Sequence, residues 1–275
     1  MSVRTLFALL ALPALGVSAT AGSWFNGFES DTVGWFTGTA NDYGTIDRVS
    51  SGTGGVPAST GSFYAQITGA PGDEIINGQP TNTGPYTWWG GNSSAFPSGG
   101  FTNSLDIYLN MSVGSPDDTR FIFSSSINDQ TGGYLNEYYF IGGYYGGNQF
   151  VIAANDSASD QDPRTNPMPL TLTTSGWYTF QYQFFDSGGN LAVDMSVLNA
   201  QGDRLQIWNI RSPQYNLATQ VGGNGYGWFV TEDFPTLAID NSQQQFAPEP
   251  ATFGVLGLGA AVLAWKAARR AHFSR

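Results

Sequence analysis

Apolar and polar residues alternate one by one along much of the middle of this chain, and Gly, Asn, Asp and Ser separate the alternating runs. A period of two puts every second side chain on the same face of a strand, so each run predicts a β-strand with one buried face. Along residues 104–110, Leu105 and Ile107 share one face, and Asp106 lies between them on the other. The predicted strands are residues 33–37, 44–49, 62–68, 104–110, 120–127, 137–142, 149–153, 177–185, 191–198, 204–210, 226–230 and 236–240.

The body of the chain, residues 22–247, has the length of one large all-β domain, and no helical period interrupts its strands. We therefore expect an all-β fold, a two-sheet antiparallel sandwich of jelly-roll type. An FES opening at residues 28–30 and strands at 176–180 and 238–241 resemble those of concanavalin A-like lectin and carbohydrate-binding domains. Strands so close to both ends of the body predict that its two ends lie close together.

Two stretches between the predicted strands, residues 75–100 and 155–168, are rich in Gly, Asn, Asp and Pro. We expect long loops there, and long loops in compact domains tend to carry function.

The N-terminal residues 1–21 have the three parts of a secretory signal peptide. Arg4 precedes an uncharged apolar run at 6–17, and Ala19 and Ala21 frame a cleavage site of small residues. The mature chain is therefore expected to begin directly after Ala21. An N-terminal membrane anchor is the alternative, but the apolar run is too short to cross a bilayer.

A second apolar segment follows the body and carries no charge from residue 251 to residue 265. With the next three residues it predicts a transmembrane helix over about residues 251–268. Arg269 and Arg270 come directly after it. Because basic residues stay on the cytoplasmic side, the body is expected on the far side of the membrane.

The order of features in residues 248–275 is specific. Pro248, Glu249 and Pro250 precede the apolar helix, and an Arg cluster ends it. This order resembles the PEP-CTERM protein-sorting signal over residues 248–270. An ordinary single-pass tail anchor is the alternative.

The resemblance implies an exported protein whose C-terminal segment an integral-membrane exosortase recognises and processes. The N-terminal signal peptide predicts signal peptidase as a second processing partner. The resemblance also implies the outer surface or biofilm matrix of a Gram-negative bacterium that makes exopolysaccharide, with transient anchoring in its inner membrane. Pro248, Glu249 and Pro250 are then recognised residues and not catalytic ones.

The composition of the body excludes several chemistries. The body holds no Cys, His or Lys, because His272 and Lys266 lie in the C-terminal segment. Disulfides, Cys- or His-ligated metals, a Ser-His-Asp triad and a Lys Schiff base are therefore excluded from it. Its 20 acidic and 5 basic residues give a net charge of −15. Such a surface repels nucleic acid and anionic lipid, so no nucleic-acid partner is expected.

Aromatic residues in Gly-rich stretches are the candidates for sugar binding. Trp88 and Trp89 lie in one such stretch, and Tyr144 and Tyr145 lie in another. Exposed ring faces stack on the apolar C–H faces of sugars, and nearby amides and carboxylates pair with hydroxyls. Packing in the core is the alternative for each ring.

Asp156, Asp160 and Asp162 concentrate carboxylates within one loop. Calcium takes six to eight oxygen ligands, so the loop is a candidate calcium site, although it lacks the EF-hand order. A solvated turn is the alternative, and we expect no other cofactor.

The sequence predicts no catalytic residues. The E-x-D-x-x-E strand motif of glucanases is absent, and acidic residues that are close in sequence fit ordinary turns. We expect a non-enzymatic exported protein of the cell surface or biofilm matrix that binds polysaccharide. The alternatives are a glycan hydrolase or lyase, and a structural matrix protein or adhesin that acts through protein contacts.

Overall fold

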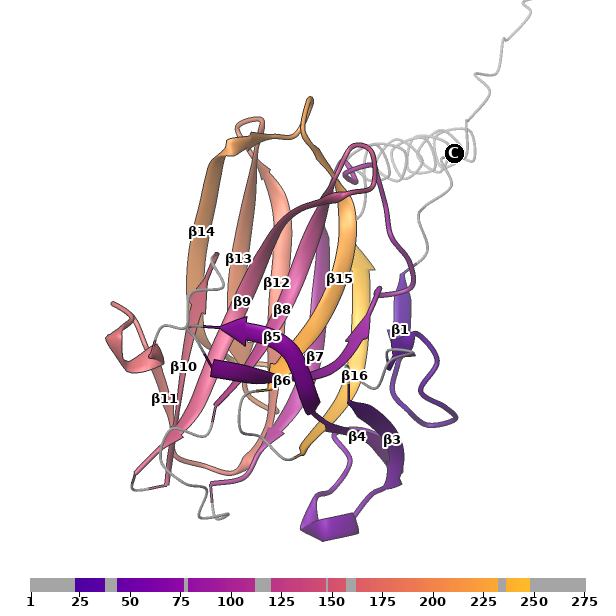
Figure 1. The fold of residues 1–275 in the computed structure, drawn as a ribbon, viewed down its shortest axis with the longest axis vertical. Coiled ribbons are helices and arrows are strands. Elements are labelled where there is room, and N and C mark those ends of the chain that lie inside the picture. Colours follow the sequence, from indigo (N-terminus) through magenta and orange to yellow (C-terminus); the bar gives the residue numbers. More distant parts are fainter. Residues whose placement is uncertain are drawn as a thin grey trace, which may run out of the picture.

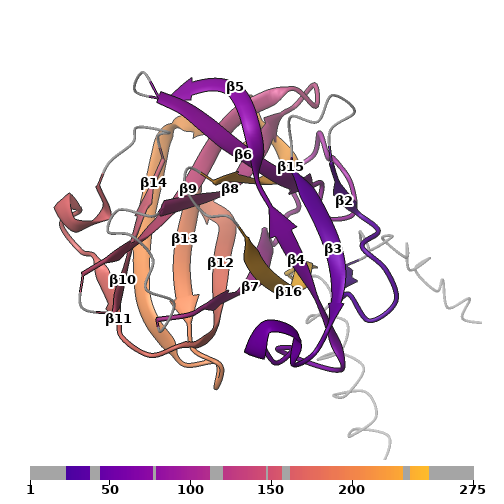
Figure 2. The same ribbon diagram turned by 60° about the horizontal axis from the view of Figure 1, so that its bottom comes forward.

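The computed structural model describes residues 23–37, 44–76, 79–111, 120–146, 148–156, 162–231 and 236–247. Within these ranges the chain forms two antiparallel β-sheets packed face to face as a sandwich (Figure 1, Figure 2). The described part contains no α-helix, and its only helical turns are η1 (Thr53–Gly55) and η2 (Pro163–Thr165). The predicted all-β, two-sheet antiparallel sandwich is confirmed.

One sheet, here called sheet A, has the strand order β14-β13-β12-β7-β16-β4-β3, and β1 pairs with β16 beside β4. All its pairings are antiparallel. Its strands are β1 (Trp24–Asn26), β3 (Thr45–Ser50), β4 (Phe63–Thr68), β7 (Phe101–Leu109), β12 (Gly176–Ser187), β13 (Asn190–Leu198), β14 (Arg204–Asn216) and β16 (Leu237–Phe246).

The other sheet, sheet B, has the order β11-β10-β9-β8-β15-β6-β2, with β5 paired to β6. In Figure 1 the β5–β6 hairpin crosses in front of β8 and β9. The strands of sheet B are β2 (Trp35–Phe36), β5 (Ala70–Ile76), β6 (Gln79–Thr87), β8 (Arg120–Asp129), β9 (Tyr134–Tyr145), β10 (Gln149–Asn155), β11 (Leu170–Leu172) and β15 (Val221–Thr231).

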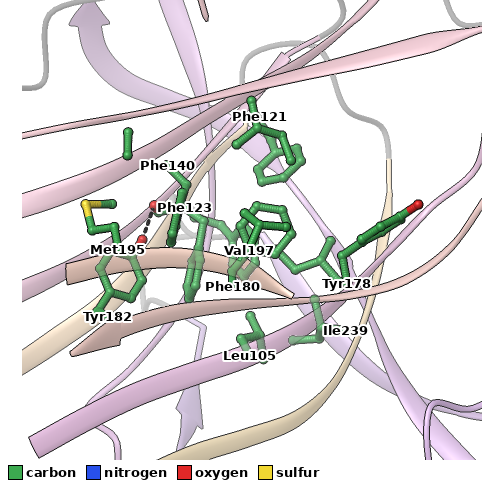
Figure 3. Packing of buried hydrophobic residues seen from close by; sticks show 14 of the residues in the cluster. Leu105, Phe121, Phe123, Phe140, Tyr178, Phe180, Tyr182, Met195, Val197 and Ile239 are labelled. Atoms are coloured by element: carbon green, nitrogen blue, oxygen red, sulfur yellow. Dashed lines mark hydrogen bonds between the residues drawn. The ribbon is translucent and has the colours of Figure 1, made fainter. Parts of the chain in front are cut away.

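Aromatic side chains from both sheets fill the space between them. The ring of Tyr182 on β12 lies 4.9 Å from that of Phe140 and 5.7 Å from that of Phe123, measured between centroids (Figure 3). The Tyr182 hydroxyl donates a hydrogen bond to the backbone carbonyl of Phe123 across the sheets. A buried phenol needs such a partner, and burial raises the pKa of Tyr182 well above its usual value.

A buried polar network joins the two sheets at one end of this core. Asn103 on β7 donates to Ser125 on β8 and to Asn224 on β15, over 3.0 and 2.9 Å. Gln244 on β16 donates in turn to the side-chain oxygen of Asn103. The Asn224 amide also donates to the backbone carbonyl of Trp88. The network therefore fixes the segment after β6 against the sandwich.

Every alternating run assigned to a strand overlaps a strand of the structure, which adds β1, β5, β6 and β11. The expectation of one long loop over residues 75–100 is wrong for its first part. The sequence of β5 and β6 is rich in Pro and Gly and has a low strand propensity, so tertiary pairing decides its state. β6 pairs with β15, and β5 pairs with β6. Pro85 lies where the β6–β15 register shifts, a place where a strand tolerates proline.

The two ends of the body lie side by side, as predicted, because β1 pairs with β16. No helix within the described ranges is long and apolar enough to cross a bilayer. Several predictions lie outside the described residues: the signal peptide 1–21 with Ala19 and Ala21, the helix 251–268, and Pro248, Glu249, Pro250, Arg269 and Arg270.

Candidate functional site

Three aromatic side chains form an open platform where β2 and β6 meet on the outer face of sheet B. The Phe36 ring lies 5.4 Å from that of Tyr86 and 4.9 Å from that of Trp88, and Tyr86 and Trp88 are 6.0 Å apart. Phe36 is 37% exposed and Trp88 is 39% exposed, whereas Tyr86 is half-buried. We call Phe36, Tyr86 and Trp88 the aromatic platform.

Strand alternation places these rings outside. Trp35 and Thr87 point into the sandwich and are buried, so their neighbours Phe36 and Tyr86 point outward. The Thr87 hydroxyl donates to the carbonyl of Gly34 over 2.7 Å, which ties β6 to the turn before β2. This hydrogen bond therefore helps to hold the two backbone segments that carry the platform together.

A cross-strand row continues the platform over sheet B. Tyr86 lies opposite Trp228 on β15, Trp228 lies opposite Ser124 on β8, and Ser124 lies opposite Tyr139 on β9. At about 4.8 Å between neighbouring strands, the row from β2 to β9 is about 19 Å long. The far end of the row is buried, since Ser124 has no exposed surface and Tyr139 is 8% exposed. The accessible rings are therefore those at the β2 end.

Trp89 does not belong to this site. Its side chain is fully buried, and its ring meets Trp24 at 6.4 Å and Phe123 at 6.1 Å, both edge to face. The prediction that Trp89 stacks on a sugar is wrong for this arrangement, because no face of the ring is open. Of the two consecutive tryptophans only Trp88 is available.

Tyr144 and Tyr145 are also closed to a ligand, with exposures of 8% and 7%. Tyr144 points into the core, and its hydroxyl accepts a hydrogen bond from the backbone N–H of Asn110. Burial raises the pKa of Tyr144 to about 12. The Tyr145 ring is covered by the Arg164 guanidinium, 4.0 Å from the ring centroid. The structure thus corrects the prediction of a sugar site at these two rings.

Two of the three predicted calcium ligands, Asp156 and Asp162, lie within the described residues. Asp162 pairs with Arg164, whose guanidinium and backbone N–H both donate to its carboxylate. Those hydrogen bonds lower the pKa of Asp162. Asp156 is exposed, and Asp160 lies outside the described residues. Within the described ranges no three acidic side chains or histidines gather in a way that suits a metal ion.

A pair of carboxylates that sequence spacing did not reveal lies on the outer face of sheet A. Asp106 on β7 and Asp240 on β16 are direct cross-strand partners, and both are buried. The Ser59 hydroxyl donates to Asp106 over 2.7 Å, and the Ser59 N–H donates to Asp240 over 2.9 Å. Burial is the main cause that raises the pKa of Asp240 to about 6.

This carboxylate pair is occupied by the protein itself. Asp106 also accepts from the Thr179 hydroxyl and the Asn241 amide, and Asp240 also accepts from the backbone N–H groups of Thr60 and Asn241. The pair anchors the loop before β4 and offers no open carboxylate to a substrate.

A shallow cavity of about 420 Å³ lies beside β1 and the turn that follows it. Its polar side chains are engaged by the protein, and the Glu29 carboxylate accepts from the backbone N–H groups of Ser62 and Phe63. Asn26 donates to the Val33 carbonyl, and Asp31 accepts from the Val33 N–H. The aromatic platform is therefore the candidate site.

Residues 247–270 match the PEP-CTERM protein-sorting motif, which confirms the predicted motif. The motif implies an exported protein that an exosortase sorts and processes, with transient anchoring in the membrane. No curated protein matches the chain.

The body is similar in fold to several solved structures. The CBM2 module of the evolved Dit of Lactobacillus casei BL23 phage J-1 is 12% identical, with a TM-score of 0.39 over 81% of this chain and 95% of that chain. Peanut lectin with a 9mer peptide is 13% identical, with a TM-score of 0.36 over 83% and 99%. Winged bean acidic lectin complexed with methyl-α-D-galactose is 10% identical, with a TM-score of 0.34 over 82% and 99%.

Proposed function

We propose that this chain is a non-enzymatic protein of the outer surface or biofilm matrix of a Gram-negative bacterium, and that it binds extracellular polysaccharide. The aromatic platform is the observation that carries the proposal. Its rings lie within 6.0 Å of one another on the outer face of a sheet, and two of them keep more than a third of their surface open. The sorting motif supplies the route to the surface.

Ring faces suit a sugar because the ring of a pyranose has apolar C–H faces and polar edges. Stacking removes the apolar surface of both partners from water and leaves the hydroxyls free to find hydrogen bonds. The net charge of −15 on the body disfavours an anionic polymer. The proposed ligand is therefore a neutral polysaccharide.

The absence of Cys, His and Lys from the body supports a binding role over a catalytic one. The cross-strand carboxylate pair, Asp106 with Asp240, holds the loop before β4 through its hydrogen bonds. A glycosidase needs one carboxyl group free to donate a proton and another free to attack or activate water. Assays for release of reducing ends or unsaturated sugars from the polysaccharides that bind are expected to give no product.

Binding is tested with the mature protein on soluble neutral polysaccharides in affinity electrophoresis. Replacing Phe36 and Trp88 together with Ala is expected to weaken binding at least about tenfold, since each stacked ring contributes about 0.5–1.5 kcal/mol beyond its buried area. Tyr134→Ala is the matched control, because that ring is 58% exposed outside the platform. Equal binding by the double variant and the wild type would exclude the platform.

Sorting is tested by fractionating cells with and without the exosortase. The full-length chain is expected to stay in the inner membrane when the enzyme is absent, and a shortened chain is expected outside the cell when it is present. Unprocessed protein in the cytosol of normal cells would contradict the proposal.

A further inference from the structure

Four glutamine side chains form a regular array on the outer face of sheet A. Gln181 and Gln183 lie on β12, Gln243 and Gln245 lie on β16, and β7 runs between these strands. Gln181 and Gln243 both pair with Ser104, while Gln183 and Gln245 both pair with Thr102. The four positions are the corners of a rectangle of about 10 by 7 Å, from strand spacing and rise. We call Gln181, Gln183, Gln243 and Gln245 the amide array.

The array faces solvent because its neighbours along each strand face the core. Tyr182 and Phe184 on β12 are fully buried between the sheets, so Gln181 and Gln183 point the other way. On β16, Gln244 points inward to Asn103, which turns Gln243 outward. Gln183 and Gln245 are exposed, and the other two amides are partly exposed.

The amide groups of the array are not engaged by the described part of the protein. None of the four side-chain amides takes part in a hydrogen bond with the described residues, in contrast to Gln244, which lies on the same strand and is bound on the inner side. Each amide carries two donors and a carbonyl acceptor, and a sugar hydroxyl is both donor and acceptor. The array is therefore matched to a polyhydroxyl surface.

The charges around the array favour a neutral ligand. The array lies in two cross-strand rows, one through Ser104 and one through Thr102. The nearest charged side chain in these rows is Asp194, which lies opposite Gln183 and pairs with Arg211 over 2.9 Å. Among the described residues, no unpaired cation lies in these two rows to attract an anionic polymer. At the margin, Phe25 lies opposite Gln243 and is 58% exposed, which adds one ring face at the edge of the polar surface.

We propose that the amide array is a second contact surface for a neutral polysaccharide, and that the protein bridges two chains. The aromatic platform points outward from sheet B and the amide array points outward from sheet A, so the two surfaces face in opposite directions. One chain does not reach both faces without wrapping around the sandwich. The bridging proposal rests on the proposed function, because it also needs the aromatic platform. Binding at the amide array does not depend on the platform.

The test uses four forms of the mature protein. The platform variant carries F36A and W88A, and the array variant carries Q181A, Q183A, Q243A and Q245A. The control variant carries Q201A and Q214A, which remove two exposed amides from outside the array. The probes are a soluble neutral β-glucan and a soluble galactomannan, with alginate as the anionic comparison. Affinity electrophoresis measures binding, and turbidity on mixing measures bridging.

We expect the wild type and the control variant to bind a neutral probe and make it turbid. The array variant is expected to bind about fivefold more weakly, which is the loss expected when about one net hydrogen bond is removed. It should give no turbidity, and neither should the platform variant, because each keeps one contact surface. Alginate should bind to none of them.

The outcomes separate the two proposals. An array variant that binds and bridges like the wild type overturns this inference and leaves the platform standing. A platform variant that binds like the wild type, while the array variant does not, overturns the platform. A wild type that binds neither neutral probe overturns both.

A second array variant separates the loss of the amide groups from a folding defect. Q181E with Q183E keeps the size of both side chains but replaces their donors with charge. It is expected to match the array variant in its loss of turbidity with the neutral probes. Thermal unfolding of every form checks that the fold is retained.

Discussion

The interior of the sandwich and the outer face of sheet B meet at two consecutive tryptophans. Trp89 has no exposed surface and packs edge to face on Trp24 and Phe123, whereas Trp88 is 39% exposed and contacts Phe36. One step along the backbone moves the same kind of side chain from a structural role to a candidate binding role. Residue type alone therefore does not identify a binding ring in an aromatic-rich chain.

The two outer faces differ in a second way. The outer face of sheet B carries the aromatic platform at its accessible end. The outer face of sheet A carries the amide array and the buried pair Asp106 and Asp240. Rings lose contact with water by stacking, whereas amides and carboxylates need hydrogen bonds. The faces are therefore expected to respond to different perturbations: ring removal for one, pH for the other.

The largest effect on stability is expected when the two tryptophans are replaced one at a time. Trp89→Ala leaves a cavity among packed rings and is expected to lower the free energy of unfolding by about 3–5 kcal/mol. Trp88→Ala removes a surface ring and should cost less than about 1 kcal/mol. Urea unfolding followed by circular dichroism measures both. Similar losses for the two variants would mean that Trp88 is packed as a core residue.

A smaller effect should come from pH acting on sheet A. The pKa of Asp240 is raised to about 6 by burial, above the value of 3.8 for an unperturbed Asp. The folded state then binds a proton more readily than the unfolded state, so stability is fully present below about pH 4 and lost as pH rises through 6. Lowering pH from 7 to 4 should therefore raise the free energy of unfolding by about 1–3 kcal/mol through this group.

Asp240→Asn checks that assignment, because it removes the titrating group and should flatten the pH dependence between pH 4 and 7. The slope is the readout, since the level also changes with the hydrogen bonds of the new amide. Asp47→Asn on the exposed face of β3 serves as the control and should keep the slope. An unchanged slope in Asp240→Asn would assign the pH dependence to another group.

The smallest effect on stability is expected at Asp162, after β10, where an ion pair rather than an aromatic ring lies at the surface. Asp162→Ala removes the ion pair with Arg164 and the side-chain cap of η2, and should lower stability by about 0.5–1 kcal/mol. Thermal unfolding with calcium and with chelator tests the calcium hypothesis in the same proteins. Calcium stabilisation of the wild type that is lost in the variant would support a site at Asp162; an equal response would reject that ligand.

Much of the fold followed from the sequence because alternation over strands such as 177–185 and 191–198 leaves one solution for their buried faces. The strands β5 and β6 were missed because their Pro- and Gly-rich sequence carries no alternation. Only pairing makes them strands, since β6 pairs with β15 and β2, and β5 pairs with β6. Of the platform rings, Trp88 was predicted from the sequence and Phe36 was not. Phe36 reaches Trp88 through the pairing of β2 with β6, which no local pattern encodes.

By itself, the sequence determined the class of fold, the acidic and His-free body, and the sorting motif, because period, composition and a contiguous motif are local properties. Only the tertiary structure decided which rings face solvent and which carboxylates meet. Asp106 and Asp240 lie far apart in the chain and become neighbours through the β7–β16 pairing. Burial depends on what packs against a side chain, and that is fixed by the assembly of both sheets rather than by any one strand.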